Sequence, residues 1–136
     1  MTRWPSPPRI VGRRGAVLLF LALLDFVYAF SLCRPSGGGT IAPLLLDLAS
    51  PHVFAWAWLV VGALCLAGAL GRRRFPVLDI WPFLAAVLIK IFWAALFVFG
   101  WMAGEVERGW LGGAVWLAFG VLVMTLAGWQ EPGDGT

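Results

Sequence analysis

The sequence carries four long apolar runs, at residues 16–33, 53–70, 80–101 and 110–129. Each run has about the 20 residues that a helix needs to cross roughly 30 Å of hydrocarbon. There the backbone must satisfy its own hydrogen bonds, so only helices and closed barrels cross, and these runs lack the alternation of barrel strands. Hydrophobic residues make up 61% of the 136-residue chain and charged residues 12%, outside the usual mixture for a soluble domain. We therefore predict an all-α integral membrane protein, with one four-helix bundle domain over residues 1–136.

The arginines indicate which way the helices run. One side of the predicted bundle carries Arg3, Arg9, Arg13 and Arg14 before the first run and Arg72, Arg73 and Arg74 between the second and third. The other side carries only Arg34 and Arg108. Because short basic loops prefer the cytoplasm, we predict cytoplasmic termini, with a basic arm at 1–14 and a short acidic tail at 130–136. A cleaved signal peptide is the alternative for the first run, but Asp25 interrupts it and no small-residue cleavage site follows.

Tryptophans near the ends of the runs are typical of the aromatic belts at membrane interfaces. We predict that six of them anchor the helices: Trp81 and Trp129 at the inner interface, and Trp56, Trp58, Trp101 and Trp110 at the outer one. The first outer loop ends in an apolar stretch at residues 41–49, where Asp47 is the one charge. This pattern predicts a short helix lying in the outer interface.

Asp25 and Lys90 each stand alone near the middle of an apolar run. An ionisable group at that depth costs roughly 2.5 to 3.5 kcal/mol on insertion scales, so it usually has a partner or a functional role. The first and third runs cross in the same direction, and the two residues lie within about 1 to 2 Å of the same depth at a rise of 1.5 Å per residue. We predict a salt bridge between them, within one chain or between two, with the Tyr28 hydroxyl close enough to join it.

Small residues mark the faces on which the helices are expected to pack. Ala86 and Ala94 flank Lys90 at four-residue spacing, and Ala22 and Ala29 lie on the face of Asp25. The same reasoning marks Ala63 and Ala67 on the second run and Gly112, Gly120 and Gly128 on the fourth. Such stripes predict packing and do not indicate a function.

Two interpretations of the charged pair follow. In the first, the charges neutralise each other inside one bundle and fix its register, which is how buried charges are normally arranged. In the second, one charge lines a water-filled path, as a proton-binding or substrate-binding carboxylate or as a pore charge.

Other kinds of site are not indicated by the sequence. We predict no metal or cofactor, because Cys33, Cys65 and His52 stand at no ligand spacing, and no enzyme, because no nucleophile with a base or phosphate loop is visible. The net charge of +3 comes from arginine clusters that topology explains, so we predict no nucleic-acid partner.

Four short patterns give the chain a family resemblance. They are RRGA at 13–16, AWAW at 55–58, RGW at 108–110 and GWQEP at 128–132. With these the chain resembles a group of small four-span membrane proteins encoded by actinobacterial phages and prophages. The resemblance implies a multi-pass protein of the bacterial inner (cytoplasmic) membrane, and it implies no particular activity.

Three functions are compatible with that setting. The first is a non-enzymatic protein that binds the bilayer and either itself or another envelope or phage protein. The second is a holin-like or accessory lysis pore, although the acidic tail departs from the basic tail common in holins. The third is a small proton-coupled transporter with Asp25 as the coupling carboxylate. Small multidrug exporters have a glutamate in the first helix instead, and no lysine that matches Lys90 in the third.

Overall fold

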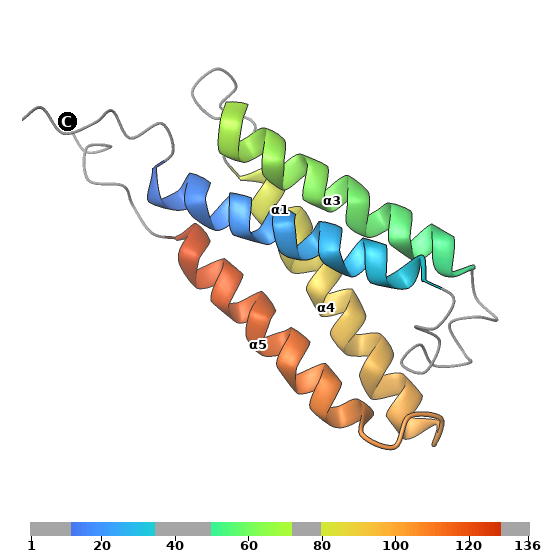
Figure 1. Ribbon diagram of the computed structural model, residues 1–136. Coiled ribbons are helices and arrows are strands. Elements are labelled where there is room, and N and C mark those ends of the chain that lie inside the picture. Colours follow the sequence, from blue (N-terminus) through green and yellow to red (C-terminus); the bar gives the residue numbers. More distant parts are fainter. Residues whose placement is uncertain (1–11, 35–49, 72–79, 129–136) are drawn as a thin grey trace, which may run out of the picture.

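The computed structural model describes residues 12–34, 50–71 and 80–128 (Figure 1). These ranges hold four helices: α1 (Arg13–Leu32), α3 (Pro51–Gly71), α4 (Trp81–Met102) and α5 (Gly109–Ala127). Each helix is long and apolar enough to cross a membrane, and the described ranges contain no strand. The prediction of an all-α, multi-pass membrane bundle is therefore confirmed. The predicted outer helix at 41–49, most of the basic arm, Arg72 to Arg74, Trp129 and the acidic tail lie outside the described residues.

The helices differ from the apolar runs mainly at their ends. α1 begins at Arg13, three residues before the run at 16–33, because hydropathy marks the hydrocarbon-compatible stretch and not the whole helix. Pro51 opens α3, as its fixed φ angle and missing N–H group favour. At the end of α4, Gly104 adopts a φ of 77°, and the Glu105 N–H group donates to the Gly100 carbonyl oxygen at 2.9 Å. This left-handed residue closes the helix and starts the turn into α5.

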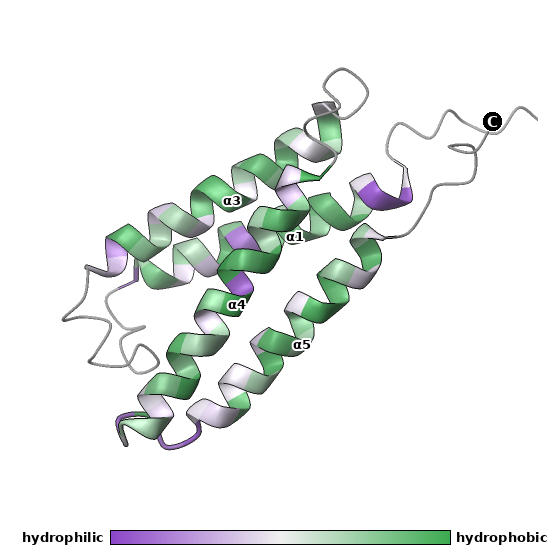
Figure 2. Cartoon of the chain, turned by 180° about the vertical axis from the view of Figure 1, so that it is seen from behind, coloured by the Kyte–Doolittle hydropathy of each residue, from purple (hydrophilic) through white to green (hydrophobic). Residues whose placement is uncertain are grey.

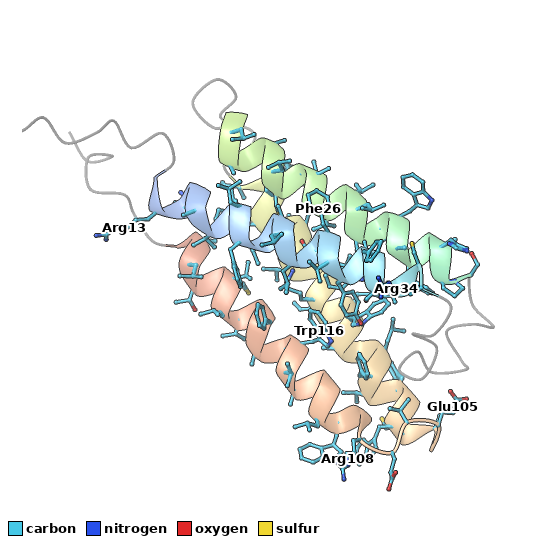
Figure 3. The ribbon with its side chains drawn as sticks, viewed as in Figure 1. Arg13, Phe26, Arg34, Glu105, Arg108 and Trp116 are labelled. Carbon is cyan, nitrogen blue, oxygen red and sulfur yellow. The ribbon has the colours of Figure 1, made fainter. Side chains whose placement is uncertain are left out.

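The bundle consists of two hairpins that cross (Figure 1). α1 packs along α3, α4 packs along α5, and the smaller contact between α3 and α4 joins the two pairs. Gly62 allows the close approach within the first hairpin, since a β-carbon there would lie 2.8 Å from the Phe26 ring. Figure 3 shows the Phe26 side chain between α1 and α3. In the second hairpin, a β-carbon at Gly113 would lie 2.6 Å from Val98 Cγ2, so that glycine keeps α5 close to α4.

The packing stripes predicted on α1 and α4 are confirmed, since Ala22, Ala29, Ala86 and Ala94 are all buried. Those on the other two helices are partly wrong. Ala63 and Ala67 are exposed, as is Gly128, whereas Gly120 is buried. α3 instead turns Gly62, Cys65, Gly68 and Ala69 inward. Small residues occur on every face of α3, so spacing alone did not identify the buried one.

The buried residues of the described ranges form two apolar clusters. One lies toward the start of α1 and includes Leu18, Leu21, Cys65, Phe83 and Val123; the other lies toward its end and includes Ala29, Phe54, Trp58, Ile89 and Trp93. Asp25 follows the first cluster along α1 and precedes the second. Figure 2 shows hydrophilic colour in the middle of the bundle, where α1 and α4 pass each other, and mostly apolar colour along the outward faces of the helices. The bundle thus has an apolar outside, as lipid tails require, and its charges lie in the centre, away from the lipid.

Candidate functional site

The charged centre is an ion pair between α1 and α4. Lys90 Nζ donates to Asp25 Oδ1 at 3.0 Å, and both side chains have an exposed fraction of 0%. The pair forms within a single chain, as the depth argument allowed. The second carboxylate oxygen, Asp25 Oδ2, is also buried and makes no hydrogen bond to any described residue. Both charges are therefore buried inside the bundle, where they compensate each other.

An aromatic cluster adjoins the lysine end of the pair through Trp58. The ammonium of Lys90 lies 5.3 Å from the centre of the Trp58 ring, which places the cation within range of the ring's negative face. Tyr28 lies beside Trp58, with their ring centres 4.6 Å apart, and Trp116 lies 5.1 Å from Tyr28 and 5.3 Å from Trp58. Figure 3 shows Trp116 reaching from α5 toward the other helices. All four helices thus contribute to one cluster, because Tyr28 comes from α1, Trp58 from α3 and Lys90 from α4.

Tyr28 takes a different place from the one predicted. Its hydroxyl accepts a short hydrogen bond from Trp93 Nε1. Among the described residues it makes no hydrogen bond to Asp25 or Lys90, so it belongs to the aromatic cluster and not to the ion pair. Tyr28 lies three residues after Asp25 and Trp93 three residues after Lys90, which puts each aromatic residue on the same helix face as its charge. One α1–α4 interface therefore holds both a charged contact and a neutral polar contact.

The prediction that Trp58 is an interfacial anchor is wrong. Its side chain has an exposed fraction of 0%, and its Nε1 is buried without a hydrogen-bond partner among the described residues. Trp56, two residues earlier, is 67% exposed. Residues i and i+2 of a helix lie on nearly opposite sides of it, so burial of Trp58 leaves Trp56 on the outward side.

The other described tryptophans of the predicted belts are exposed near helix ends. Trp81 is the first residue of α4, Trp101 lies at its end, and Trp110 is the second residue of α5. The anchoring role of these three and of Trp56 stays a prediction.

The charges at the two ends of the bundle remain peripheral. Figure 3 shows Arg13 at the start of α1 pointing away from the helices, and Arg34, Glu105 and Arg108 at the opposite end. Arg14 differs from Arg13, because its guanidinium lies over the Phe83 ring at 5.3 Å from the ring centre. Which end faces the cytoplasm stays a prediction from the arginine counts.

Sequence reasoning missed Trp93 and Trp116 as members of the site. Trp93 stands at mid-depth in α4, where an anchoring tryptophan does not belong, and its spacing of three from Lys90 was the available signal. Trp116 carried no comparable signal, because α5 has no charged residue from which a buried face can be marked.

Cys65 lies beside the site, on the side of the first apolar cluster. Its thiol is fully buried and donates to the Pro82 carbonyl oxygen at 3.7 Å, which links α3 to α4. Within the described ranges, no three His, Cys, Asp or Glu side chains gather where they could hold a metal ion. Chemically, the centre offers one compensated charge pair inside a shell of aromatic and apolar groups.

Comparisons with protein-family models, with curated proteins and with solved structures found no match for this chain. The resemblance to phage and prophage membrane proteins therefore stays a prediction from the four short patterns.

Proposed function

We propose that this chain is a non-enzymatic, multi-pass protein of the bacterial inner membrane that acts by binding other molecules, with Asp25 and Lys90 as a structural clamp. The observation that carries the proposal is the complete burial of both charges in one ion pair within one chain. A clamp of this kind fixes which faces of α1 and α4 meet. It supports a rigid bundle whose activity resides on its outer surface.

Proton-coupled transport would require a carboxylate that meets water from alternate sides of the membrane. Asp25 has no exposed surface, one of its oxygens accepts from Lys90, and the Trp58 ring lies against the Lys90 ammonium. Of the two carboxylate oxygens, Asp25 Oδ2 lacks a hydrogen-bond partner among the described residues, and it is buried. These features favour a fixed pair over a coupling site.

A pore would require polar side chains along a path through the membrane. Away from the helix ends, the large exposed residues of the described helices are apolar, including Leu23 and Val27 on α1 and Leu117 and Val121 on α5. Such faces suit lipid or another apolar surface rather than water. This supports partner binding over the holin-like alternative.

The test compares three chains reconstituted into vesicles at equal density: wild type, Asp25→Asn and Lys90→Met. A pH-sensitive dye inside the vesicles reports proton entry under an imposed membrane potential. We expect proton entry at the rate of empty vesicles for all three, together with a lower folded yield for both variants. Proton entry that needs Asp25 would establish transport instead. Leakage by wild type to ions and small dyes alike would establish a pore.

A further inference from the structure

A pocket of about 320 Å³ opens between α1, α4 and α5 at the end of the bundle where α1 starts. Its walls are apolar side chains from the first two turns of α4 and the last turn of α5, among them Phe83, Leu84, Val87, Met124 and Ala127. Figure 1 shows the start of α1 and the end of α5 at this same end of the molecule. The volume falls within the range of about 300 to 1,000 Å³ that is typical of small-molecule sites.

Among the residues that the structure describes, Arg14 is the one charged residue that lines this pocket. Its guanidinium packs over the Phe83 ring, which holds the charge at the pocket wall. A guanidinium recognises a phosphate through the N–H groups in its plane. One lining residue therefore suits a phosphate group while the others suit a hydrocarbon chain.

The sequence beside the helix ends that form the pocket has a net charge of the same sign. The pocket is formed by the first turns of two helices and the last turn of a third, so it lies where the apolar spans end. In the sequence, the stretches that contain or adjoin these three helix ends and the end of α3 carry seven arginines and three acidic residues. Basic pockets between membrane helices at the cytoplasmic surface are a known way of holding anionic lipid headgroups.

We propose that this pocket binds one anionic phospholipid of the leaflet that surrounds it. An acyl chain lies against Phe83, Leu84 and Met124, and the phosphate meets the guanidinium of Arg14. The lipid occupies the space between α1 and α5, two helices that make little contact with each other. This inference does not depend on the proposed function, because a pore or a transporter of the same fold would hold the same lipid.

Native mass spectrometry of the full-length protein, released from a neutral detergent, tests this inference. Dioleoyl phosphatidylglycerol and dioleoyl phosphatidylcholine are offered separately, at equal concentrations. We expect the wild-type chain to retain phosphatidylglycerol about fivefold more strongly, which is the preference that one arginine near a membrane surface gives. Glycerol 3-phosphate, which has the headgroup charge without the chains, should not compete.

Matched variants separate the pocket from the general charge of that end. Arg14→Gln should abolish the preference, whereas Arg13→Gln removes the same charge from a side chain that points away from the bundle and should leave it intact. Leu84→Trp should lower retention of both lipids by filling the pocket, whereas Leu88→Trp, one turn further along and exposed, should not. Met124→Trp fills the pocket from α5 and replaces the Leu84 variant if that chain does not fold.

Two outcomes would overturn the proposal. Equal loss of the preference in the Arg13 and Arg14 variants would mean that diffuse charge attracts the lipid. Unchanged retention by folded pocket-filling variants would mean that the lipid binds elsewhere on the bundle.

Discussion

Replacing one member of the buried ion pair should destabilise the bundle far more than replacing both. At 3.0 Å and an effective dielectric constant of about 20, the attraction between Asp25 and Lys90 is about 5.5 kcal/mol. Much of this offsets the loss of hydration, but removal of one partner leaves the other charge buried and uncompensated, which costs about 3 to 5 kcal/mol. We expect that loss for Asp25→Asn and for Lys90→Met alone. The double variant leaves one buried amide and no charge, and should lose only about 1 to 3 kcal/mol.

The free energy of unfolding can be measured by titrating the purified protein in mixed micelles with sodium dodecyl sulfate and following tryptophan fluorescence. The two single variants and the double variant form a double-mutant cycle that isolates the interaction. We expect a coupling energy above about 3 kcal/mol, within the range found for close charge pairs. A coupling energy below about 1 kcal/mol, with the double variant losing the sum of the single losses, would refute the clamp.

Three further outcomes follow from the packing and the predicted orientation. Trp58→Ala should lower the free energy of unfolding in micelles by about 3 to 5 kcal/mol, whereas Trp56→Ala, which is exposed, should change it by less than about 0.5 kcal/mol. Gly109→Ala should destabilise by about 1 to 3 kcal/mol, because its β-carbon would overlap the Phe97 carbonyl oxygen. Gly120→Ala, whose β-carbon would meet only Ile91 Cγ1 at 3.6 Å, should be neutral or slightly stabilising in the same titration. Cys33, which is exposed at the end of α1, should react with a membrane-impermeant maleimide in intact cells if the termini are cytoplasmic, and labelling only after lysis would reverse the orientation.

The spans and the charged pair were predictable from the sequence for definite physical reasons. Hydrocarbon allows few backbone structures, so four apolar runs of helical length indicate four helices. An unpaired charge is costly in hydrocarbon, so a lone carboxylate and a lone ammonium at equal depth are expected to pair. The contact between Asp25 and Lys90 was predictable for this reason. Neither argument needs knowledge of how the helices pack.

The aromatic cluster was harder to predict because it depends on which helix faces turn inward. In a membrane helix the buried and lipid-facing sides are both apolar, so hydropathy does not separate Trp58 from Trp56. The rotation of α3 is set by its contacts with α1 and α4, where Gly62 and Cys65 lie. The pocket beside Arg14 was likewise not predictable from the sequence, because it depends on how α5 is placed relative to α1 in the bundle.

Solid-state NMR on the protein in lipid bilayers tests the central claim most directly. Lys90 is the only lysine in the sequence, so a chain labelled with ¹⁵N-lysine and ¹³C-aspartate gives one assignable side-chain nitrogen. We predict a strong dipolar coupling between that nitrogen and an aspartate carboxyl carbon, lost in Asp25→Asn and unchanged when labelled chains are diluted with unlabelled ones. Absence of the coupling, or its loss on dilution, would contradict a charge pair enclosed within a single chain.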